Sequence, residues 1–417
     1  MTKTEHPNTT GAGDKAYRES LEWLYRQSRG GAKRDPARMR ALVVALGLEY
    51  PPRSVHVVGT NGKGTVTAMC AAAAAAAGWR SAAFTSPHVE EFGERITVDG
   101  TAIPPEVVVE FVERIRSRDL PVTPSFFELT LALALEHFAR TGVEFGAFEA
   151  GVGAERDATA VLERVAAVAV TPIALDHVET LGPSLRDIAR DKAAAMRRGL
   201  PVASATQQPE VLEVLQEEAR RRGCELHVDA PESPLFAPPA GLAAESDPVR
   251  RSNQRVAAAT MRLLGDVNEA ALAEGLGIPP LPGRGERFQV AGITVLLDGA
   301  HDPAAGRALS ERAGGEYVLL FGSLGRKQGE ATLRALEGRS QRAFVTRAGG
   351  EPPTVAGSST RTVIEEPARA LLAAIAATPP GGRLVVAGSL YLAGELRPLL
   401  RRLAATGSMT GLMTEER

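Results

Sequence analysis

The feature that most constrains this chain is a glycine-rich segment with one lysine, between an apolar run and an alanine-rich run. The segment is Gly59-Thr60-Asn61-Gly62-Lys63-Gly64-Thr65. Residues 54–58 predict a buried strand, and residues 66–77 predict a helix because alanine has the highest intrinsic helix propensity. A strand, a glycine-rich turn and a helix form the setting of a phosphate-binding loop, in which backbone N–H groups and the helix N-terminus attract phosphate.

The loop by itself predicts only that some polyphosphate binds. Lys63 would supply a positive charge to the β- and γ-phosphates, and Thr65 a hydroxyl to phosphate or Mg²⁺. The strict pattern G-x-x-x-x-G-K-[ST] is not met, because Val57 stands at the place of its first glycine and Gly64 precedes Thr65. A glycine-rich structural turn is the alternative, and it leaves a lysine between two glycines unexplained.

Length and composition restrict the class of protein. A chain of 417 residues predicts two domains. A formal net charge of -2 argues against a nucleic-acid-binding protein. Cys70 and Cys224 have no disulfide or metal spacing, the first residues have no apolar leader, and the apolar run 68–77 is too short to cross a membrane. We therefore expect a cytoplasmic protein that binds neither nucleic acid nor membrane.

Alternation of apolar strands with helical segments runs along most of the chain and predicts an α/β fold with a mainly parallel sheet. Three prolines and a glycine in 278–283 predict a stiff linker. Beyond it the alternation restarts, which predicts a smaller Rossmann-like α/β domain. The expected divisions are a disordered tail over 1–16, an ATP-binding P-loop domain over 17–280, a linker over 278–284 and the smaller domain over 285–417.

Six further motifs occur in one order between residues 84 and 391. With the loop, they resemble the Mur ligase superfamily and, within it, the folylpolyglutamate synthase/dihydrofolate synthase family. The motifs are Phe84-Thr85-Ser86-Pro87-His88 with Glu94-Arg95-Ile96; Phe127-Glu128-Leu129-Thr130; Glu149-Ala150-Gly151-Val152-Gly153 with Asp157-Ala158-Thr159; Asp176-His177 with Lys192-Ala193; Pro282-Gly283-Arg284 with Asp298-Gly299-Ala300-His301; and Gly388-Ser389-Leu390-Tyr391.

The resemblance implies an ATP- and Mg²⁺-dependent ligase and a role for each matching residue. It implies Mg²⁺ ligands at Ser86, Glu149 and His177, and catalytic roles for Lys63, Lys192 and His177. Residues 59–65 would bind ATP together with four others further along the chain. These four are Asn253, Arg284, Asp298 and His301.

Lys192 matches a family lysine that becomes carbamylated, which arginine cannot do. The chain has only six lysines among 48 basic residues, so a lysine deep in the sequence suggests a task that arginine cannot perform. Each of these residues also has a structural alternative. Ser86 could be a turn residue, Glu149 an exposed strand-end acid, His177 a helix cap, and Lys192 part of a solvated helix face.

Three segments depart from the family pattern. The family's Gly-Gly-Arg-Leu-Asp-Ala-Thr-Asn corresponds here to residues 153–160, its His-Asn-Pro has Asp302 in place of asparagine, and its Asp-Lys-Asp corresponds to residues 326–328. These departures put in doubt the details of substrate and glutamate binding.

The function we expect is addition of L-glutamate to a folate or dihydropteroate carboxylate through an acyl phosphate, by a monomer. The sequence does not distinguish folylpolyglutamate synthase, dihydrofolate synthase or a bifunctional enzyme. Three alternatives remain open: another Mur-type amino-acid ligase, a P-loop ATPase that drives movement, and a degraded homologue that binds nucleotide without making product.

Overall fold

The computed structural model describes residues 12–27 and 34–406, without the side chains of 326–328. The chain forms two compact units that divide between Ile278 and Pro279, inside the predicted linker. Helix α1 runs over Ala12–Arg26. The expectation of disorder over 1–16 was therefore wrong for residues 12–16, where the segment continues into an amphipathic helix, and residues 1–11 lie outside the described residues.

The first unit is built on an eight-stranded sheet in the order β4-β3-β2-β5-β1-β6-β7-β8. The six strands from β2 to β8 in this order pair in parallel, while β3 runs antiparallel to β2 and β4 antiparallel to β3. The strands are β1 Arg53–Val58, β2 Ser81–Phe84, β3 Ile96–Val98, β4 Thr101–Ala102, β5 Phe145–Glu149, β6 Val165–Val170, β7 Pro201–Ser204 and β8 Glu225–Val228.

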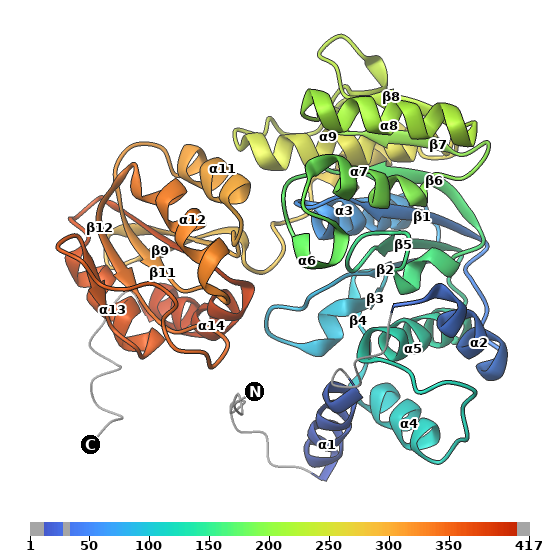
Figure 1. Cartoon of the computed structure of the whole chain (residues 1–417), viewed down its shortest axis with the longest axis horizontal. Coiled ribbons are helices and arrows are strands. Elements are labelled where there is room, and N and C mark those ends of the chain that lie inside the picture. The colour runs from blue at the N-terminus through green and yellow to red at the C-terminus, as the bar shows by residue number, and fades with distance from the viewer. Residues whose placement is uncertain (1–11, 28–33, 407–417) are drawn as a thin grey trace. The chain divides into compact units, whose positions relative to one another are not determined.

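Helices cover both faces of this sheet (Figure 1). Side chains alternate along a strand, so β1 sends Val55 and Val57 into the core under α3 and α9, and Val58 into the core on the other face. The helices are α1, α2 Pro36–Leu46, α3 Lys63–Ala76, α4 Pro105–Arg116, α5 Phe126–Arg140, α6 Val178–Leu181, α7 Leu185–Lys192, α8 Pro209–Arg222, α9 Pro248–Arg262 and α10 Glu269–Leu276.

The alanine-rich helix α3 packs closely because its side chains are small. A Cβ atom added at Gly275 of α10 would lie 2.2 Å from the backbone nitrogen of Ala73 in α3. Small residues on both helices therefore allow the backbones of α3 and α10 to pack closely against each other.

The second unit contains a six-stranded sheet in the order β13-β12-β11-β14-β10-β9, in which only β9 is antiparallel to its neighbour. Its core lies between the sheet and its helices. Its elements are β9 Arg284–Val290, β10 Ile293–Asp298, α11 Pro303–Ala313, β11 Tyr317–Phe321, α12 Arg326–Glu337, β12 Ser340–Val345, β13 Arg361–Val363, α13 Pro367–Ala377, β14 Arg383–Ala387 and α14 Leu390–Thr406. The α/β class with a mainly parallel sheet, followed by a smaller α/β unit, is confirmed.

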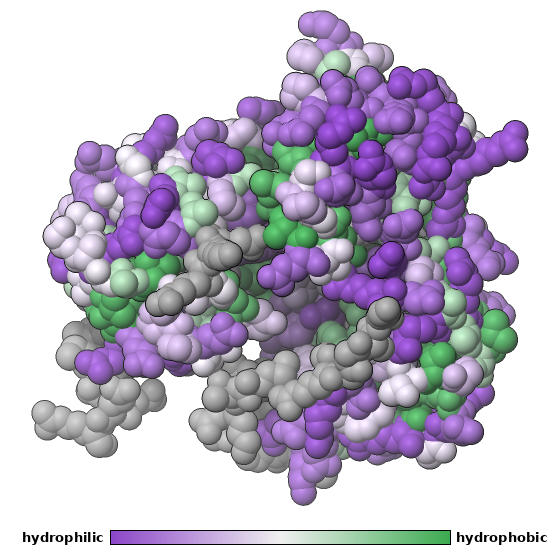
Figure 2. Space-filling model, in the orientation of Figure 1, coloured by the Kyte–Doolittle hydropathy of each residue, from purple (hydrophilic) through white to green (hydrophobic). Residues whose placement is uncertain are grey.

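Hydrophilic residues cover most of the face shown in Figure 2. Among residues 12–27 and 34–406, no helix has both the length and the apolar character to cross a membrane.

Candidate active site

Four segments of the predicted site leave the sheet at one edge. The phosphate loop follows β1, Ser86 follows β2, Glu149 ends β5, and the segment 171–177 follows β6. These strands are adjacent in the order β2-β5-β1-β6 and parallel, so their carboxyl ends share one edge. This is the edge at which open α/β sheets bind ligands.

The first half of the phosphate loop is tied to the segment that follows β6. The N–H groups of Thr60 and Asn61 donate to the carbonyl of Pro172 at 3.0 and 3.3 Å. The Thr60 hydroxyl donates to the Ala174 carbonyl and accepts from its N–H. Thr60 therefore anchors the loop, and this hydroxyl is already occupied by protein partners.

Gly59 is required at the start of the loop. Its φ is +141°, and a Cβ atom there would lie 1.9 Å from Oγ1 of Thr171. No other residue fits such a conformation and such a close approach. The loop can therefore lie directly against the neighbouring strand end only with glycine at this position.

The second half of the loop begins α3, and here the N–H groups are available. Gly62 caps α3 with φ 92° and without a side-chain hydrogen bond. The first N–H groups of a helix have no partner inside the helix, and the helix dipole favours an anion beside them. Residues 62–65 are therefore the part of the loop suited to phosphate.

Asn253 of α9 reaches this loop across about 190 residues of sequence. A Cβ atom at Gly62 would lie 2.2 Å from Oδ1 of Asn253, and Asn253 is only 5% exposed. The asparagine thus packs against the turn that it was predicted to join in nucleotide binding.

Lys63, Glu149 and Ser86 form one connected group. Nζ of Lys63 lies 3.8 Å from Oε1 of Glu149, and the N–H of Ser86 donates to Oε2 of Glu149 at 2.8 Å. Nζ of Lys63 also donates to the Thr60 carbonyl. Glu149 is 3% exposed, so the alternative of an exposed strand-end acid was wrong.

His177 lies at the N-terminus of the short helix α6 with φ 50°. Its Nε2 lies 3.5 Å from Oδ2 of Asp176, and its side chain is about half exposed. In the part of the chain that the structure describes, no three His, Cys, Asp or Glu side chains gather as a ready metal site. The structure brings Ser86 and Glu149 together. It does not show His177 beside them as a third metal ligand.

Lys192 is buried beside the loop, so the alternative of a solvated helix face was wrong. It ends α7, is 4% exposed, and donates from Nζ to the Gly59 carbonyl at 2.5 Å. Burial lowers the pKa of Lys192 to about 7, and Lys63 acts in the same direction, while three aspartates oppose both. A lysine with such a pKa is partly neutral at physiological pH, which is the form that captures CO₂.

The residues present fit Mg²⁺ by their chemistry. A serine hydroxyl and a buried carboxylate are oxygen ligands of the kind that Mg²⁺ takes together with phosphate oxygens and water. The ammonium of Lys63 is already balanced by Glu149. Ser86 and Glu149 would hold the ion, and the assignment of His177 as a third ligand stays a prediction.

The second unit carries the other predicted nucleotide residues. Arg284 begins β9. Asp298 pairs with Arg312 at 3.2 Å and accepts from the N–H of Ala300, so its carboxylate already has protein partners. Nδ1 of His301 donates to the Gly299 carbonyl at 2.9 Å, because a carbonyl only accepts, and this fixes its tautomer.

The departure at Asp302 has a structural explanation. Asp302 is fully buried, caps α11, and accepts from the N–H groups of Ala304 and Ala305. Aspartate and asparagine cap helices about equally well, so the exchange preserves this turn. Residues 326–328 begin α12, and their side chains lie outside the described residues.

The segment 153–160, which departs from the family pattern, is held in place by hydrogen bonds to two aspartates. Asp157 accepts from the N–H of Val152 and from the N–H and hydroxyl of Thr159. Asp191 accepts from the N–H of Ala154 at 2.7 Å. Asp191 is one of the residues that sequence reasoning missed, as are Thr171 and Pro172, and no local pattern marks them.

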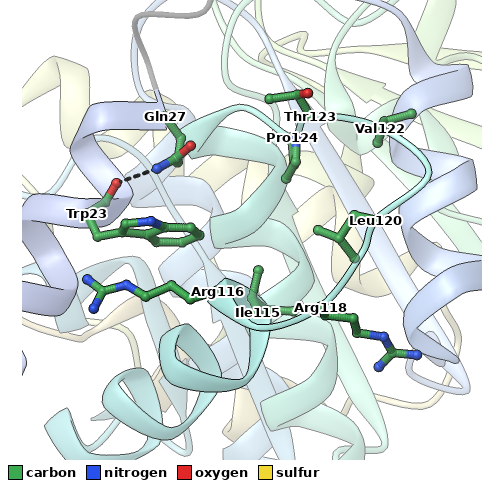
Figure 3. A pocket seen from close by; sticks show the side chains of 9 residues that line it. All are labelled: Trp23, Gln27, Ile115, Arg116, Arg118, Leu120, Val122, Thr123 and Pro124. Atoms are coloured by element: carbon green, nitrogen blue, oxygen red, sulfur yellow. Dashed lines mark hydrogen bonds between the residues drawn. The ribbon is translucent and has the colours of Figure 1, made fainter.

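Two cavities of the first unit are lined by none of the predicted site residues. One of about 250 Å³ lies between α1 and the loop after α4. Figure 3 shows Trp23 and Gln27 on one side of it and Leu120 on the other. Another of about 250 Å³ is lined in part by His56, Arg40 and Arg197. The candidate site at the sheet edge is defined by its residues and their contacts.

Comparison with known proteins identifies the family. No family model matches the chain. The dihydrofolate synthase/folylpolyglutamate synthase of Bacillus subtilis is 31% identical over 358 residues, which cover 77% of this chain and 83% of that protein. The enzyme of that name from Escherichia coli is 31% identical over 72% of this chain and 74% of its own length.

Solved structures share the fold. Escherichia coli FolC in complex with DHPP and ADP has a TM-score of 0.81 at 23% identity, over 94% of this chain and 99% of that one. Folylpolyglutamate synthase from Mycobacterium tuberculosis complexed with ADP has a TM-score of 0.79 at 26% identity, over 93% and 99%. The resemblance read from the motifs is confirmed: the chain belongs to the folylpolyglutamate synthase/dihydrofolate synthase family of ATP-dependent ligases.

Proposed function

We propose that this protein joins L-glutamate by an amide bond to the carboxylate of dihydropteroate or of a folate, using ATP. The observation that carries the proposal is the buried group at the sheet edge, in which Glu149 contacts both Ser86 and Lys63 at the N-terminus of α3. Such a group suits a nucleoside triphosphate with a divalent ion, and the family supplies the class of acceptor.

The first step activates the carboxylate. An oxygen of the substrate carboxylate attacks the γ-phosphorus of ATP, the bond to the β-phosphate oxygen breaks, and an acyl phosphate and ADP form. Lys63 and the N–H groups of residues 62–65 stabilise charge on the phosphate oxygens. Mg²⁺, when bound, supplies further neutralisation of the phosphates.

The second step forms the amide. The amine of L-glutamate attacks the acyl carbon, phosphate leaves with its bonding electrons, and the nitrogen loses a proton. The carboxylate must be activated first because an unmodified carboxylate has no good leaving group. Asn253, Arg284, Asp298 and His301 are proposed nucleotide contacts.

Lys192 is proposed to act as its carbamate. Its neutral amine attacks CO₂, the nitrogen releases one proton, and the product carries a negative charge. This would convert a cation beside Gly59 into an anion that orients the metal ligands. The pKa of about 7 supports this role, because the neutral amine is then abundant.

We further propose that the enzyme acts as a cytoplasmic monomer. Its substrates would be ATP, L-glutamate and a pteroate or folate, without nucleic acid. Light scattering of the purified chain at micromolar concentration should give one mass near 43.9 kDa. A mass near twice this value at the same concentration would exclude the monomer.

The test of the function is substrate-dependent ADP release by purified protein. ADP should form only when L-glutamate is present with dihydropteroate or tetrahydrofolate, and mass spectrometry should detect the product with one added glutamate. Which acceptor supports turnover distinguishes the two synthase activities.

Lys63→Ala should abolish this turnover, because the variant lacks the positive charge proposed to act on the phosphates. Lys63 also pairs with the buried Glu149, so thermal unfolding of the variant is measured beside the assay to separate lost catalysis from lost stability. ADP release without glutamate would favour an ATPase. Nucleotide binding without any amide product would favour a degraded homologue.

A further inference from the structure

The loop that carries Ser86 is folded around one carboxylate. Oε2 of Glu94 accepts from the N–H of Val89 at 2.7 Å, and Oε1 accepts from the N–H groups of Glu90 and Glu91, both at 2.9 Å. A carboxylate has acceptor sites for all three donors at once. Glu94 therefore holds three consecutive residues of the loop in one conformation.

Glu94 belongs to a short helical turn, η2 Phe92–Arg95, which leads into β3. Strand β3 pairs antiparallel with β2, and Phe84 faces Ile96 in this pairing. This pairing fixes both ends of the segment 85–95 to the sheet, and Glu94 fixes residues 89–91 in the middle of the segment. The segment is a loop that leaves the sheet at the end of β2 and returns to it at the start of β3.

Thr85 and Arg95 add links between the two sides. The N–H of Thr85 donates to the Arg95 carbonyl at 2.9 Å, and its hydroxyl donates to the Glu94 carbonyl at 3.0 Å. Nε of Arg95 donates to Nδ1 of His88 at 2.7 Å. The Arg95 guanidinium also lies over the ring of Phe126 at the start of α5. The loop is thus bound to its own base and to a neighbouring helix.

Ser86 lies near the start of this loop and connects the loop to the phosphate site. Its N–H donates to Glu149, whose other oxygen faces Lys63. Without the Glu94 contacts, the position of Ser86 would depend on its own bond to Glu149 and on the two bonds of Thr85. Fixing the loop by Glu94 therefore limits how far the backbone of Ser86 can move from the Glu149 carboxylate.

We infer that Glu94, assisted by Arg95, is a positioning residue that sets the affinity of Ser86 and Glu149 for the divalent ion bound with nucleotide. The inference deepens the proposed function and rests on its assignment of Ser86 and Glu149 as ligands. Outer residues that orient metal ligands typically change metal affinity by about 10- to 100-fold when altered.

Glu94→Gln is the sharpest change, because it keeps the size of the side chain but leaves one acceptor oxygen for three N–H donors. Manganese binding in the presence of ADP, followed by electron paramagnetic resonance, should weaken by about tenfold or more. Binding of ADP without metal, by calorimetry, should stay within about twofold, because the proposed phosphate contacts are the N–H groups at the start of α3, and Glu94 bonds instead to residues 89–91.

Hydrogen exchange reports the loop itself. In Glu94→Gln the amides of residues 89–91 should exchange faster than in the parent protein, since each loses or shares its acceptor. Glu113→Gln is the matched control, because Glu113 lies exposed on α4 and its change removes the same charge. The control should alter neither metal affinity nor exchange in this loop.

Faster exchange at 89–91 with unchanged Mn²⁺ affinity would overturn the inference and leave Glu94 a purely structural residue. If Glu94→Gln does not fold, Glu94→Asp provides the test, and an Mn²⁺ affinity equal to that of the parent protein would overturn it equally. Weaker Mn²⁺ binding in either variant supports it. The ligase assay of the parent protein is separate, so its failure would refute the proposed function without altering the metal result.

Discussion

Replacement of Lys192 offers the most direct test of the active site. The buried amine lies beside Gly59, and its surroundings hold its pKa near 7 instead of the usual 10.5. Burial is the largest cause, and Lys63 adds repulsion. Asp176, Asp191 and Asp157 attract the ammonium and reduce the effect. The expected outcome is a lysine that titrates in the physiological range.

The size of the effect follows from the two pKa values. At pH 7 about half of Lys192 should be neutral, against about one in 3000 for a lysine with a pKa of 10.5. The same difference corresponds to about 5 kcal/mol by which the site disfavours the ammonium form. Between pH 7 and 10.5 the unfolded chain binds this proton and the folded chain does not, so folding stability from this group rises with pH in that window.

The assay is carbon NMR of protein labelled at Cε of lysine. The chain has only six lysines, so the spectrum is simple, and Lys192→Arg should remove one signal. That signal should shift with a midpoint near pH 7. Labelled bicarbonate should add a carbamate signal that Lys192→Arg lacks.

The reasoning fails if every lysine signal titrates above about pH 9, because burial beside Lys63 would then have no effect on the amine. A midpoint near 7 without any carbamate signal would separate the two claims. The lowered pKa would stand, and the proposed carbamate would be refuted.

Three other changes test separate parts of the molecule. Lys192→Ala should lose ligase activity and regain part of it with short carboxylic acids, whereas activity that stays lost at every concentration of acid contradicts the carbamate. Gly59→Ala should lower stability by about 3 kcal/mol or more in thermal unfolding, since a Cβ there meets Thr171. Gly78→Ala, with a positive φ but open space, should cost only about 1 kcal/mol, and equal costs would exclude the clash. Glu286→Gln should destabilise the second unit by about 3 kcal/mol, because Glu286 receives two bonds from the largely buried Arg397, and a loss below about 1 kcal/mol would show that the pair contributes little.

The sequence was sufficient for the local elements of the site. The strand before Gly59, the glycine-rich turn and the helix after it were all predicted, because strand alternation, glycine conformation and alanine propensity act over a few residues. Strand β5, whose last residue is Glu149, belongs to the alternation of strands and helices that the sequence predicts. Since the carboxyl ends of parallel strands share one edge, the sequence could also place Ser86 and Glu149 at the same edge of the sheet as the loop.

Long-range contacts were beyond the sequence. It did not show that Thr60 binds the segment after β6, that Asn253 packs against Gly62, or that Asp298 pairs with Arg312. These contacts depend on which strands are neighbours and on the register between them. No short-range pattern encodes strand order, since the residues that decide it are far apart in the chain.

The sequence by itself determined that a glycine-rich loop joins the first strand of a parallel α/β sheet to the helix after it, because that information lies in consecutive residues. Only the tertiary structure decided that Lys192 is buried beside Gly59 and that Glu94 closes the loop carrying Ser86. Desolvation and the convergence of three N–H groups on one carboxylate arise from packing in three dimensions. The chemical state of a lysine and the rigidity of a loop are therefore properties of the folded chain.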